Sequence, residues 1–425
     1  MSVVKAECYA AYKESGAQWL GEIPVIWKLQ RHKDAFQLIS LRCLNPSYLK
    51  VALENIEGKT GRFISSDSEF NGDGIQFKRN DILFGKLRPY LAKVYLAEFS
   101  GNAIGDIFVY RSRPKVSPQF AAYLMRSDRY IDVINSSTSG AKMPRASSGF
   151  IADLPVAIPS LAEQITIAVY LDARTAKIDS EIALLGKKAT QYGKLKQSLI
   201  SETVTRGLDK SVPMKASDVV WIGEVPEHWS VRRGKDIFEK TKNKAGLDSS
   251  SYDVLSLTLN GVIKRDLDNM KGKIPASFDG YQIANPGDLV LCLFDIDVTP
   301  RIVGYVNNLG IITSAYTVIK GKKKINMKYF LYYYLEQNRN GSLLANSKTL
   351  RSTMTFDLFS QLLLPVPPLE EQRAIASYLD KKTAQIDHIV KTINTQIDNL
   401  RDLRKALISD VVTGKIKVVS EEGAV

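Results

Sequence analysis

An internal repeat constrains the fold of this chain more than any other feature. The segment Trp19-Leu-Gly-Glu-Ile-Pro-Val-Ile-Trp27 returns 202 residues later as Trp221-Ile-Gly-Glu-Val-Pro-Glu-His-Trp229. A second block, which opens with Leu161-Ala-Glu-Gln164, returns 208 residues later as Leu369-Glu-Glu-Gln372. The residues between the two blocks align poorly. The chain is therefore one unit of about 205 residues written twice, with a repeated frame and two different middles.

The second block predicts one long helix in each copy. Its apolar side chains recur every seven residues, which is the pattern of a coiled-coil seam. The seam consists of Leu171, Ile178, Leu185, Tyr192 and Leu199 in the first copy, and of Leu379, Ile386, Ile393, Leu400 and Leu407 in the second. Ser160-x-x-Glu163 fits a capping box at the start of the first helix, and Gly207 and Gly414 are expected to end the two helices. We expect helices of about 40–45 residues, roughly 60–68 Å long.

Helices of this length cannot bury their apolar stripes in a small domain. The simplest partner of each helix is the helix of the other copy. We therefore expect an antiparallel coiled coil with pseudo-twofold symmetry and a globular domain before each helix. In the alternative arrangement, each helix packs against its own domain as ordinary core.

The segments before the helices read as mixed α/β (α+β) domains. Short β-like runs alternate with polar turns, and a helical patch follows in each copy. The β-like runs are 82–84, 92–96, 107–110, 289–293, 302–305 and 316–319, and the helical patches are 120–125 and 328–335. We predict globular domains at 1–157 and 221–366, helices at 158–206 and 367–414, a linker at 207–220 and a tail at 415–425.

The charge of the chain indicates a polyanionic partner. Its 425 residues include 58 Lys and Arg against 45 Asp and Glu, a net charge of +13. Residues 1–157 carry +6 and residues 211–368 carry +5, whereas the helical segments are close to neutral. Two basic domains joined by a spacer suggest two contacts on one polyanion, with nucleic acid as the first candidate.

The sequence contains no membrane signal that we can identify. No stretch approaches 18 consecutive apolar residues, and the first residues form no apolar leader. We therefore expect a cytoplasmic protein with no membrane span.

Motifs for catalysis or metal binding are weak or missing. Gly58-Lys59-Thr60 resembles the end of a P-loop, but Leu53 stands where the first glycine is needed. Glu57-Gly-Lys59 has nuclease-like spacing without a convincing upstream Pro-Asp, and Asn45-Pro46-Ser47-Tyr48 reads better as a turn than as a methyltransferase loop. Three widely spaced cysteines and three separated histidines predict neither a disulfide framework nor a metal site. The chain looks like a binding protein or scaffold rather than an enzyme.

These repeated motifs resemble those of the specificity (S) subunit of Type I restriction–modification enzymes, and the resemblance covers nearly the whole chain. Its marks are Trp-x-Gly-Glu-x-Pro at each domain start, Leu-x-Glu-Gln then Tyr-Leu-Asp at each helix start, and Leu-Ile-Ser-x-x-Val-Thr at each helix end. Gly85-Lys-Leu-Arg-Pro-Tyr-Leu-Ala-Lys93 also looks like a segment of a target recognition domain. The second domain departs from it, with Thr299-Pro300-Arg301 present and Gly304 where Lys93 would align.

The resemblance implies a non-catalytic subunit that binds double-stranded DNA. Each of two target recognition domains would read half of a split, asymmetric target, and the helices would set the gap between the halves. The implied partners are two methyltransferase (M) subunits and restriction (R) subunits. S-adenosylmethionine, ATP and Mg would bind to those partners, and this chain itself would bind no cofactor.

The resemblance and the charge distribution together select candidate contact residues. Candidates for DNA contact are Lys86, Arg88, Lys93, Lys142 and Arg145 in the first domain, and Arg301, Lys348 and Arg351 in the second. Polar residues repeated in both helices are candidates for docking the methyltransferase subunits, namely Gln164, Asp172, Asp179, Gln372, Asp380 and Asp387. Solvation and helix capping are the alternative explanation for these residues. The alternative functions are a nucleic-acid-binding scaffold without split-sequence specificity and, less favoured, a standalone enzyme.

Overall fold

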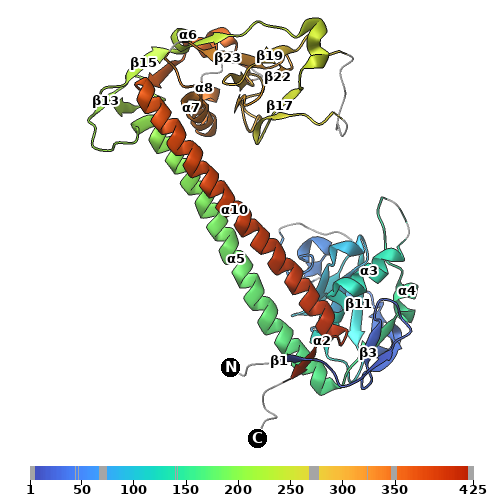
Figure 1. Cartoon of the computed structure of the whole chain (residues 1–425). Helices are drawn as coiled ribbons and strands as arrows, with labels where there is room; N and C mark the ends of the chain where they lie inside the picture. The colour runs from blue at the N-terminus through green and yellow to red at the C-terminus, as the bar shows by residue number, and fades with distance from the viewer. Residues whose placement is uncertain are drawn as a thin grey trace. The chain divides into compact units, whose positions relative to one another are not determined.

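The computed structural model describes residues 5–43, 45, 47–66, 74–138, 140, 142–267, 277–322, 324–345 and 352–419. The chain divides into two compact units, and each unit combines one globular domain with parts of two long helices (Figure 1). Unit 1 comprises residues 1–186 and 394–425, and unit 2 comprises residues 187–393. The repeat in the sequence thus corresponds to a repeat in the structure.

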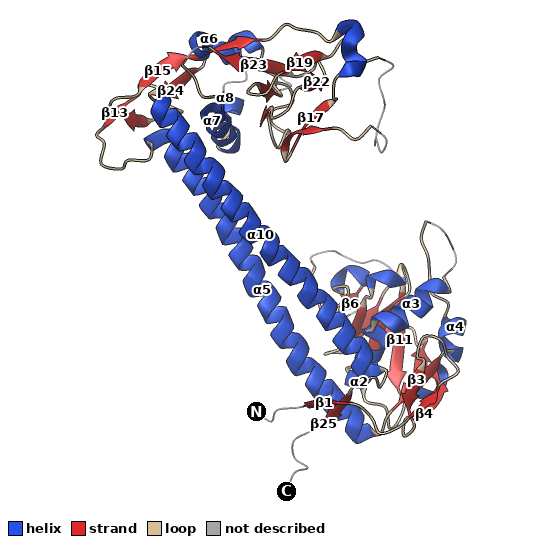
Figure 2. Ribbon diagram, in the orientation of Figure 1, coloured by secondary structure: helices blue, strands red, loops and turns tan. Residues whose placement is uncertain are grey.

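Unit 1 is built around a four-stranded antiparallel sheet in the order β5-β11-β8-β9 (Figure 2). Smaller sheets pair β2 with β3, β4 with β12, β1 with β25, and β10 with β6 and β7. The strands are β1 (Lys5–Glu7), β2 (Tyr12–Glu14), β3 (Glu22–Pro24), β4 (Lys28–Arg31), β5 (Phe36–Ile39), β6 (Lys50–Val51), β7 (Ile75–Phe77), β8 (Ile82–Gly85), β9 (Val94–Leu96), β10 (Gly101–Ala103), β11 (Ile107–Ser112), β12 (Pro155–Ile158) and β25 (Lys417–Val419). The helices of its domain are α1 (His32–Ala35), α2 (Pro118–Arg126), α3 (Asp128–Ser136) and α4 (Ser148–Asp153), with 3₁₀ turns η1 (Leu53–Asn55) and η2 (Pro89–Leu91).

Unit 2 repeats the central sheet, in the order β16-β23-β20-β21. Its smaller sheets pair β13 with β14, β15 with β24, β17 with β18, and β19 with β22. The strands are β13 (Met214–Ala216), β14 (Glu224–Pro226), β15 (Ser230–Arg233), β16 (Phe238–Lys240), β17 (Leu255–Thr258), β18 (Gly261–Lys264), β19 (Gln282–Ala284), β20 (Leu289–Leu291), β21 (Val303–Tyr305), β22 (Gly310–Ile312), β23 (Thr317–Gly321) and β24 (Leu363–Val366). The helices are α6 (Gly234–Ile237), α7 (Met327–Arg339), α8 (Ser342–Ala345) and α9 (Phe356–Gln361), with the 3₁₀ turn η3 (Gly246–Ser251). Each predicted β-like run overlaps a strand of the two central sheets, and the helical patches lie in α2 and α7.

The two long helices are α5 (Leu161–Arg206) and α10 (Leu369–Val412). The backbone N–H of Glu163 donates to the Ser160 Oγ at 3.3 Å, which is one half of the predicted capping box. The Glu163 carboxylate, which would complete the box, accepts from Tyr9 and Trp27 instead. Gly207, with φ 77°, directly follows α5, and Gly414, with φ 76°, lies two residues beyond the last residue of α10, so both glycines have left-handed backbone. The two glycines predicted to end the helices therefore lie within two residues of the observed ends.

The long helices pair antiparallel within each unit (Figure 1). In unit 1 the start of α5, with Leu171, shares a core with Val411 at the end of α10. In unit 2 the end of α5, with Val204, shares a core with Leu379 at the start of α10. The predicted pairing is therefore confirmed.

The predicted seam lies inside this helix pair. Five of the ten predicted seam residues are buried and the other five are half-buried. The two cores that contain the helix ends also contain residues of the globular domains, such as Trp27 in unit 1 and Trp229 in unit 2. At their ends, the long helices therefore pack against a globular domain as well as against each other. The alternative arrangement thus occurs there together with helix pairing.

Candidate nucleic-acid interface

Unit 1 brings four of the predicted DNA-contacting side chains onto two adjacent loops. Residues 86–92, which follow β8, contain Lys86 and Arg88, and residues 142–145 contain Lys142 and Arg145. The Arg88 N–H donates to the Pro144 carbonyl at 2.8 Å, and the Ala146 N–H donates to the Lys86 carbonyl at 2.8 Å. Two loops that are distant in sequence thus form one surface.

Asp106 lies between the two loops and binds a cation from each. Its Oδ1 is 3.2 Å from the Arg145 Nε, and its Oδ2 is 3.1 Å from the Arg145 Nη2, which makes a two-pronged ion pair. The Lys86 Nζ lies 3.7 Å from Oδ1 and 5.5 Å from the centre of the Phe108 ring. The hydrogen bond from Arg145 lowers the pKa of Asp106 below its ordinary value, so the carboxylate is charged at neutral pH.

The other candidates in the first domain differ in their availability to a ligand. Arg88 and Lys142 are exposed, and neither side chain has a partner within the described ranges. Lys93 is half-buried, and its Nζ donates to the Leu53 carbonyl at 2.6 Å. Arg88 and Lys142 therefore offer their charge to solvent, whereas Lys93 stabilises the interior of its own domain.

The second domain contains an equivalent of the 86–92 loop. The Gly85 N–H donates to the Lys93 carbonyl at 2.8 Å, and the Cys292 N–H donates to the Ile302 carbonyl at 2.8 Å in the same place on the other sheet. Ile302 therefore stands where Lys93 stands. The sequence alignment, which put Gly304 there, is wrong by two residues because the loop of the second domain, residues 293–301, is longer.

The equivalent loop carries the opposite charge. Asp295 and Asp297 are exposed, and neither carboxylate has a partner within the part of the chain that the structure describes. The Arg301 side chain turns back to its own backbone, with Nε donating to the Val303 carbonyl and Nη1 to the Leu259 carbonyl, both at 2.9 Å. The remaining candidates, Lys348 and Arg351, lie outside the described residues. The two domains thus present different chemistry on one shared frame.

Comparisons with known proteins agree on one family. The family profile described as "Type I restriction modification DNA specificity domain" matches residues 226–399. The EcoBI specificity subunit of Escherichia coli is 22% identical and covers 88% of each chain, and the EcoDI specificity subunit of the same species is 21% identical over 93% of this chain and 90% of its own. The chain belongs to the specificity (S) subunits of Type I restriction–modification systems.

Solved structures share the fold of this S subunit. A chain solved to explain complex assembly and conformational transition of the type I R-M system superposes with a TM-score of 0.69 at 19% identity, covering 92% of this chain and 98% of its own. The HsdS subunit from Thermoanaerobacter tengcongensis superposes with a TM-score of 0.54 at 19% identity and the same coverage. The predicted fold, two domains each followed by a long paired helix, is therefore confirmed.

The S subunit is the DNA specificity component of its system and is not the catalytic one. Its family carries no cofactor, and the described residues contain no cluster of three His, Cys, Asp or Glu that could hold a metal ion. No helix within the described ranges is both long enough and apolar enough to cross a membrane.

The repeated glutamines of the S subunit hold each helix to its domain. The Gln164 Oε1 accepts the Ser117 N–H at 2.7 Å, and the Gln372 Oε1 accepts the Asn326 N–H at 2.8 Å. Both glutamine side chains also donate to the proline carbonyl just before the helix, at 2.9 and 2.8 Å. Gln164 and Gln372 are buried, so their repetition has a structural cause and they are not available to a docked subunit.

The first aspartate pair makes a second repeated attachment. The Tyr123 hydroxyl donates to Asp172 at 2.6 Å, and the Tyr332 hydroxyl donates to Asp380 at 2.9 Å. Asp380 also accepts the Lys328 ammonium at 2.6 Å. The tyrosines belong to α2 and α7, so in each unit this hydrogen bond joins a helix of the globular domain to the long helix that follows it.

The last aspartate pair connects the two helices. In unit 1 the Arg404 Nε lies 3.0 Å from Asp179, and in unit 2 the Lys196 Nζ lies 2.7 Å from Asp387. Arg404 and Lys196 occupy matched positions of the two copies. Asp179 additionally pairs with the Arg62 Nη2 at 2.7 Å, which adds the globular domain to the contact.

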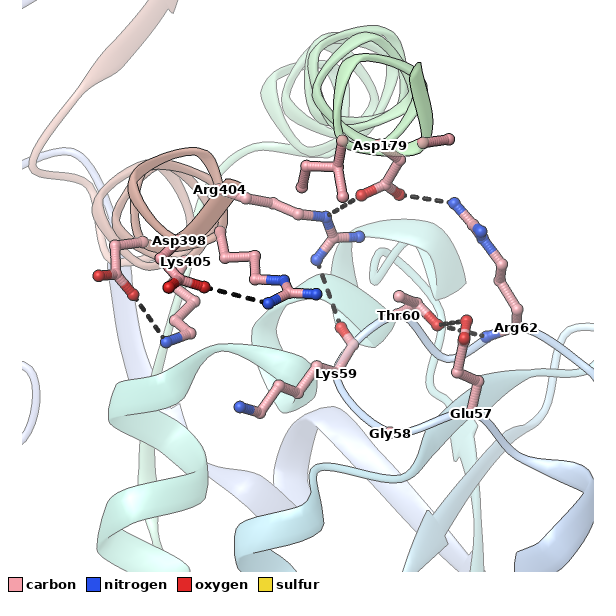
Figure 3. A pocket seen from close by; sticks show the side chains of 13 residues that line it. Glu57, Gly58, Lys59, Thr60, Arg62, Asp179, Asp398, Arg404 and Lys405 are labelled. Carbon is pink, nitrogen blue, oxygen red and sulfur yellow. Dashed lines mark hydrogen bonds and ion pairs between the residues drawn. The ribbon is translucent and has the colours of Figure 1, made fainter. Parts of the chain in front are cut away.

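Asp179, Arg62 and Arg404 line a cavity of about 690 Å³ in unit 1. Figure 3 shows that Asp179 receives Arg404 from α10 on one side and Arg62 from the domain on the other. Glu57, Lys59 and Thr60, the weak nuclease and P-loop matches, also line it, and the Thr60 hydroxyl donates to Glu57. The weak motifs thus lie in a loop that faces the helices.

A further repeated contact joins a buried tryptophan of each domain to the start of its long helix. The Trp27 Nε1 donates to Glu163 at 3.1 Å, and the Trp229 Nε1 donates to Glu371 at 3.0 Å. Both partners belong to the repeated blocks, so their joint repetition at matched positions was a signal that could have found the pair.

Proposed function

We propose that this S subunit reads a bipartite, asymmetric double-stranded DNA target. Domain 1, residues 1–157, would read one half and domain 2, residues 221–366, the other. The spacer helices, 158–206 and 367–414, would set the distance between the halves. The observation that carries the proposal is the shared sheet frame with differently charged loops, because two different half-sites require two different readers.

The chemistry of the two loops supports different readout. Arg88 and Arg145 of domain 1 can contact phosphates or donate to guanine, which presents two acceptors in the major groove. Carboxylates such as Asp295 and Asp297 of domain 2 are repelled by phosphates and can accept from the cytosine amino group. Arg88, Asp295 and Asp297 are exposed and unpaired within the described residues, so they are free to make such contacts, whereas Arg145 would make them while paired with Asp106.

We also propose that the helices hold two M subunits, with R subunits joining the assembly. Leu195 of α5 and Leu403 of α10 stand at matched positions, and they are 47% and 55% exposed. Large apolar side chains repeated on the surface suit one kind of partner bound twice. The partners would supply S-adenosylmethionine, ATP and Mg chemistry, and the assembly would act in the cytoplasm, where its DNA lies.

Mapping methylated adenines in a host that carries the complete system tests this function. We expect a split motif with a fixed gap. The double variant Arg88→Ala with Arg145→Ala should relax one half only, while Lys33→Ala, which removes a cation paired with Asp153 elsewhere on domain 1, should leave the motif intact. A continuous motif, or duplex binding that ignores the split sequence, would favour the general nucleic-acid-binding scaffold instead.

A further inference from the structure

We propose that Asp106 is a positioning residue that makes domain 1 selective. It would hold the Arg145 guanidinium in the orientation that reads a base edge, and it would weaken the attraction of Lys86 and Arg145 to phosphates of any sequence. The inference rests on the proposed function, because it assumes that the loops at 86–92 and 142–145 contact DNA.

The geometry of the ion pair leaves one edge of Arg145 for a ligand. Asp106 binds Nε and Nη2, and Nη1 has no partner within the described residues. The Arg145 side chain is half exposed, whereas Asp106 is more covered. A guanidinium held at two donors keeps its other edge in one direction, and two parallel N–H groups suit the paired acceptors of guanine.

The charge of Asp106 acts on both loops. Without a carboxylate, Lys86 and Arg145 would form a purely cationic surface, and such surfaces bind the DNA backbone without regard to sequence. Asp106 removes one of these two positive charges locally while leaving the donors in place. Selective binding requires weak contact with wrong sequences as well as good contact with the right one.

The second domain supplies an internal comparison. Phe108 pairs with Phe84 across the first sheet as Thr317 pairs with Leu291 across the second, so Ala315 occupies the place of Asp106. Leu293 stands in the place of Lys86, because the backbone carbonyl of each of these two residues accepts a hydrogen bond from an equivalent backbone N–H of its own domain. The first domain therefore has both the Asp106 carboxylate and the Lys86 cation, and the second domain has neither at these places.

The test compares Asp106→Asn with a matched control in the assembled S and M complex. Asp153 forms an exposed ion pair with Lys33 at 2.6 Å in the same domain, so Asp153→Asn removes the same charge away from the loops. Affinity is measured for a duplex with the mapped target and for a scrambled duplex, each over a range of salt concentrations. Thermal unfolding of each variant reports whether the domain is intact.

We expect Asp106→Asn to bind the scrambled duplex several-fold more tightly, with a salt dependence steeper by about one counterion. The ratio of target to scrambled affinity should fall roughly 10-fold, within the range that one bidentate base contact supplies. Asp106→Glu should recover most of the ratio, and Asp153→Asn should change neither quantity.

Arg145→Lys keeps the charge but loses the fork, so it should lower the ratio without tightening scrambled binding. This second variant keeps the test decisive if Asp106→Asn is unstable. An unchanged ratio in both variants, while the wild type discriminates well, overturns the role of Asp106 and leaves the proposed function standing. If the wild-type complex itself does not discriminate, the proposed function fails and the role of Asp106 fails with it.

Discussion

The indole Nε1 of Trp229 lies 3.0 Å from the Oε2 of Glu371, the third residue of α10. Trp27 and Glu163 of α5 repeat this relationship in the other unit. The indole is buried in the domain core, so the carboxylate at the helix start satisfies a donor that has lost its water. This hydrogen bond thus adds to the glutamine and tyrosine contacts that join each long helix to its domain.

Glu371→Ala should destabilise unit 2 by about 1–3 kcal/mol, because a buried indole N–H is left without an acceptor. Glu370→Ala is the matched control, since Glu370 is its exposed neighbour and forms an exposed ion pair with Arg373 on the helix surface. That control should change stability by less than about 0.5 kcal/mol. Denaturant unfolding of the full chain measures both variants, and equal losses would show that the indole contact is not the cause.

Asp179→Asn should cost more stability than Asp387→Asn. The Asp179 side chain is 18% exposed and pairs with Arg62 and Arg404, whereas Asp387 is 62% exposed and pairs with Lys196. Removing the Asp179 carboxylate leaves two cations close together, which should lower the free energy of unfolding by roughly 1–3 kcal/mol. An exposed ion pair such as that of Asp387 contributes about 0–1 kcal/mol to stability. Thermal unfolding at low and high salt measures the difference. A larger loss for Asp387→Asn would contradict this reading of the two ion pairs.

His32 should make unit 1 less stable in acid. Its ring lies among Phe36, Tyr110 and Tyr130, and burial lowers its pKa from 6.5 to about 3. Below pH 6.5 the unfolded chain takes up a proton that the folded chain does not. The free energy of unfolding of unit 1 therefore keeps its full value, as far as His32 is concerned, above pH 6.5. It falls by about 1.4 kcal/mol per pH unit as the pH drops from 6.5 toward 3.

His32→Leu, which has a similar volume and no charge, should flatten the pH dependence of unfolding between pH 6.5 and 5. His388→Gln, at an exposed position, should not. Denaturant midpoints across this pH range measure the effect. The same slope in wild type and His32→Leu would mean that other groups cause the acid sensitivity.

Arg88→Ala and Arg301→Ala should separate binding from stability. Arg88 is exposed and unpaired within the described residues, so its loss should reduce the salt dependence of DNA binding by about one counterion and leave unfolding almost unchanged. Arg301 donates to two backbone carbonyls, so its loss should lower stability by about 1–2 kcal/mol. Salt-dependent binding by the complex and thermal unfolding of the chain measure the pair. The reverse pattern would reassign the DNA contact to Arg301.

The tertiary structure decided which polar residues remain available for contact with DNA or with a partner subunit. Gln164 and Gln372 have the same repetition in sequence as Asp179 and Asp387, yet the glutamines are buried. Their partners, Ser117 and Asn326, are nearly fifty residues away, and nothing in the local pattern shows that contact. Lys93 and Arg301 likewise look like surface cations until the carbonyls that they bind are located.

The sequence by itself determined the repeat, the paired helices, their caps and the central strands. These features depend on local periodicity, such as the seven-residue spacing of Leu171 and Ile178, and on residues with a backbone preference, such as Gly207. The cluster of Lys86, Asp106 and Arg145, and the inverted charge at Asp295, emerged only in the fold. Loop residues carry no periodic signal, and an ion pair depends on distances that are set when strands and loops from separate parts of the chain pack together.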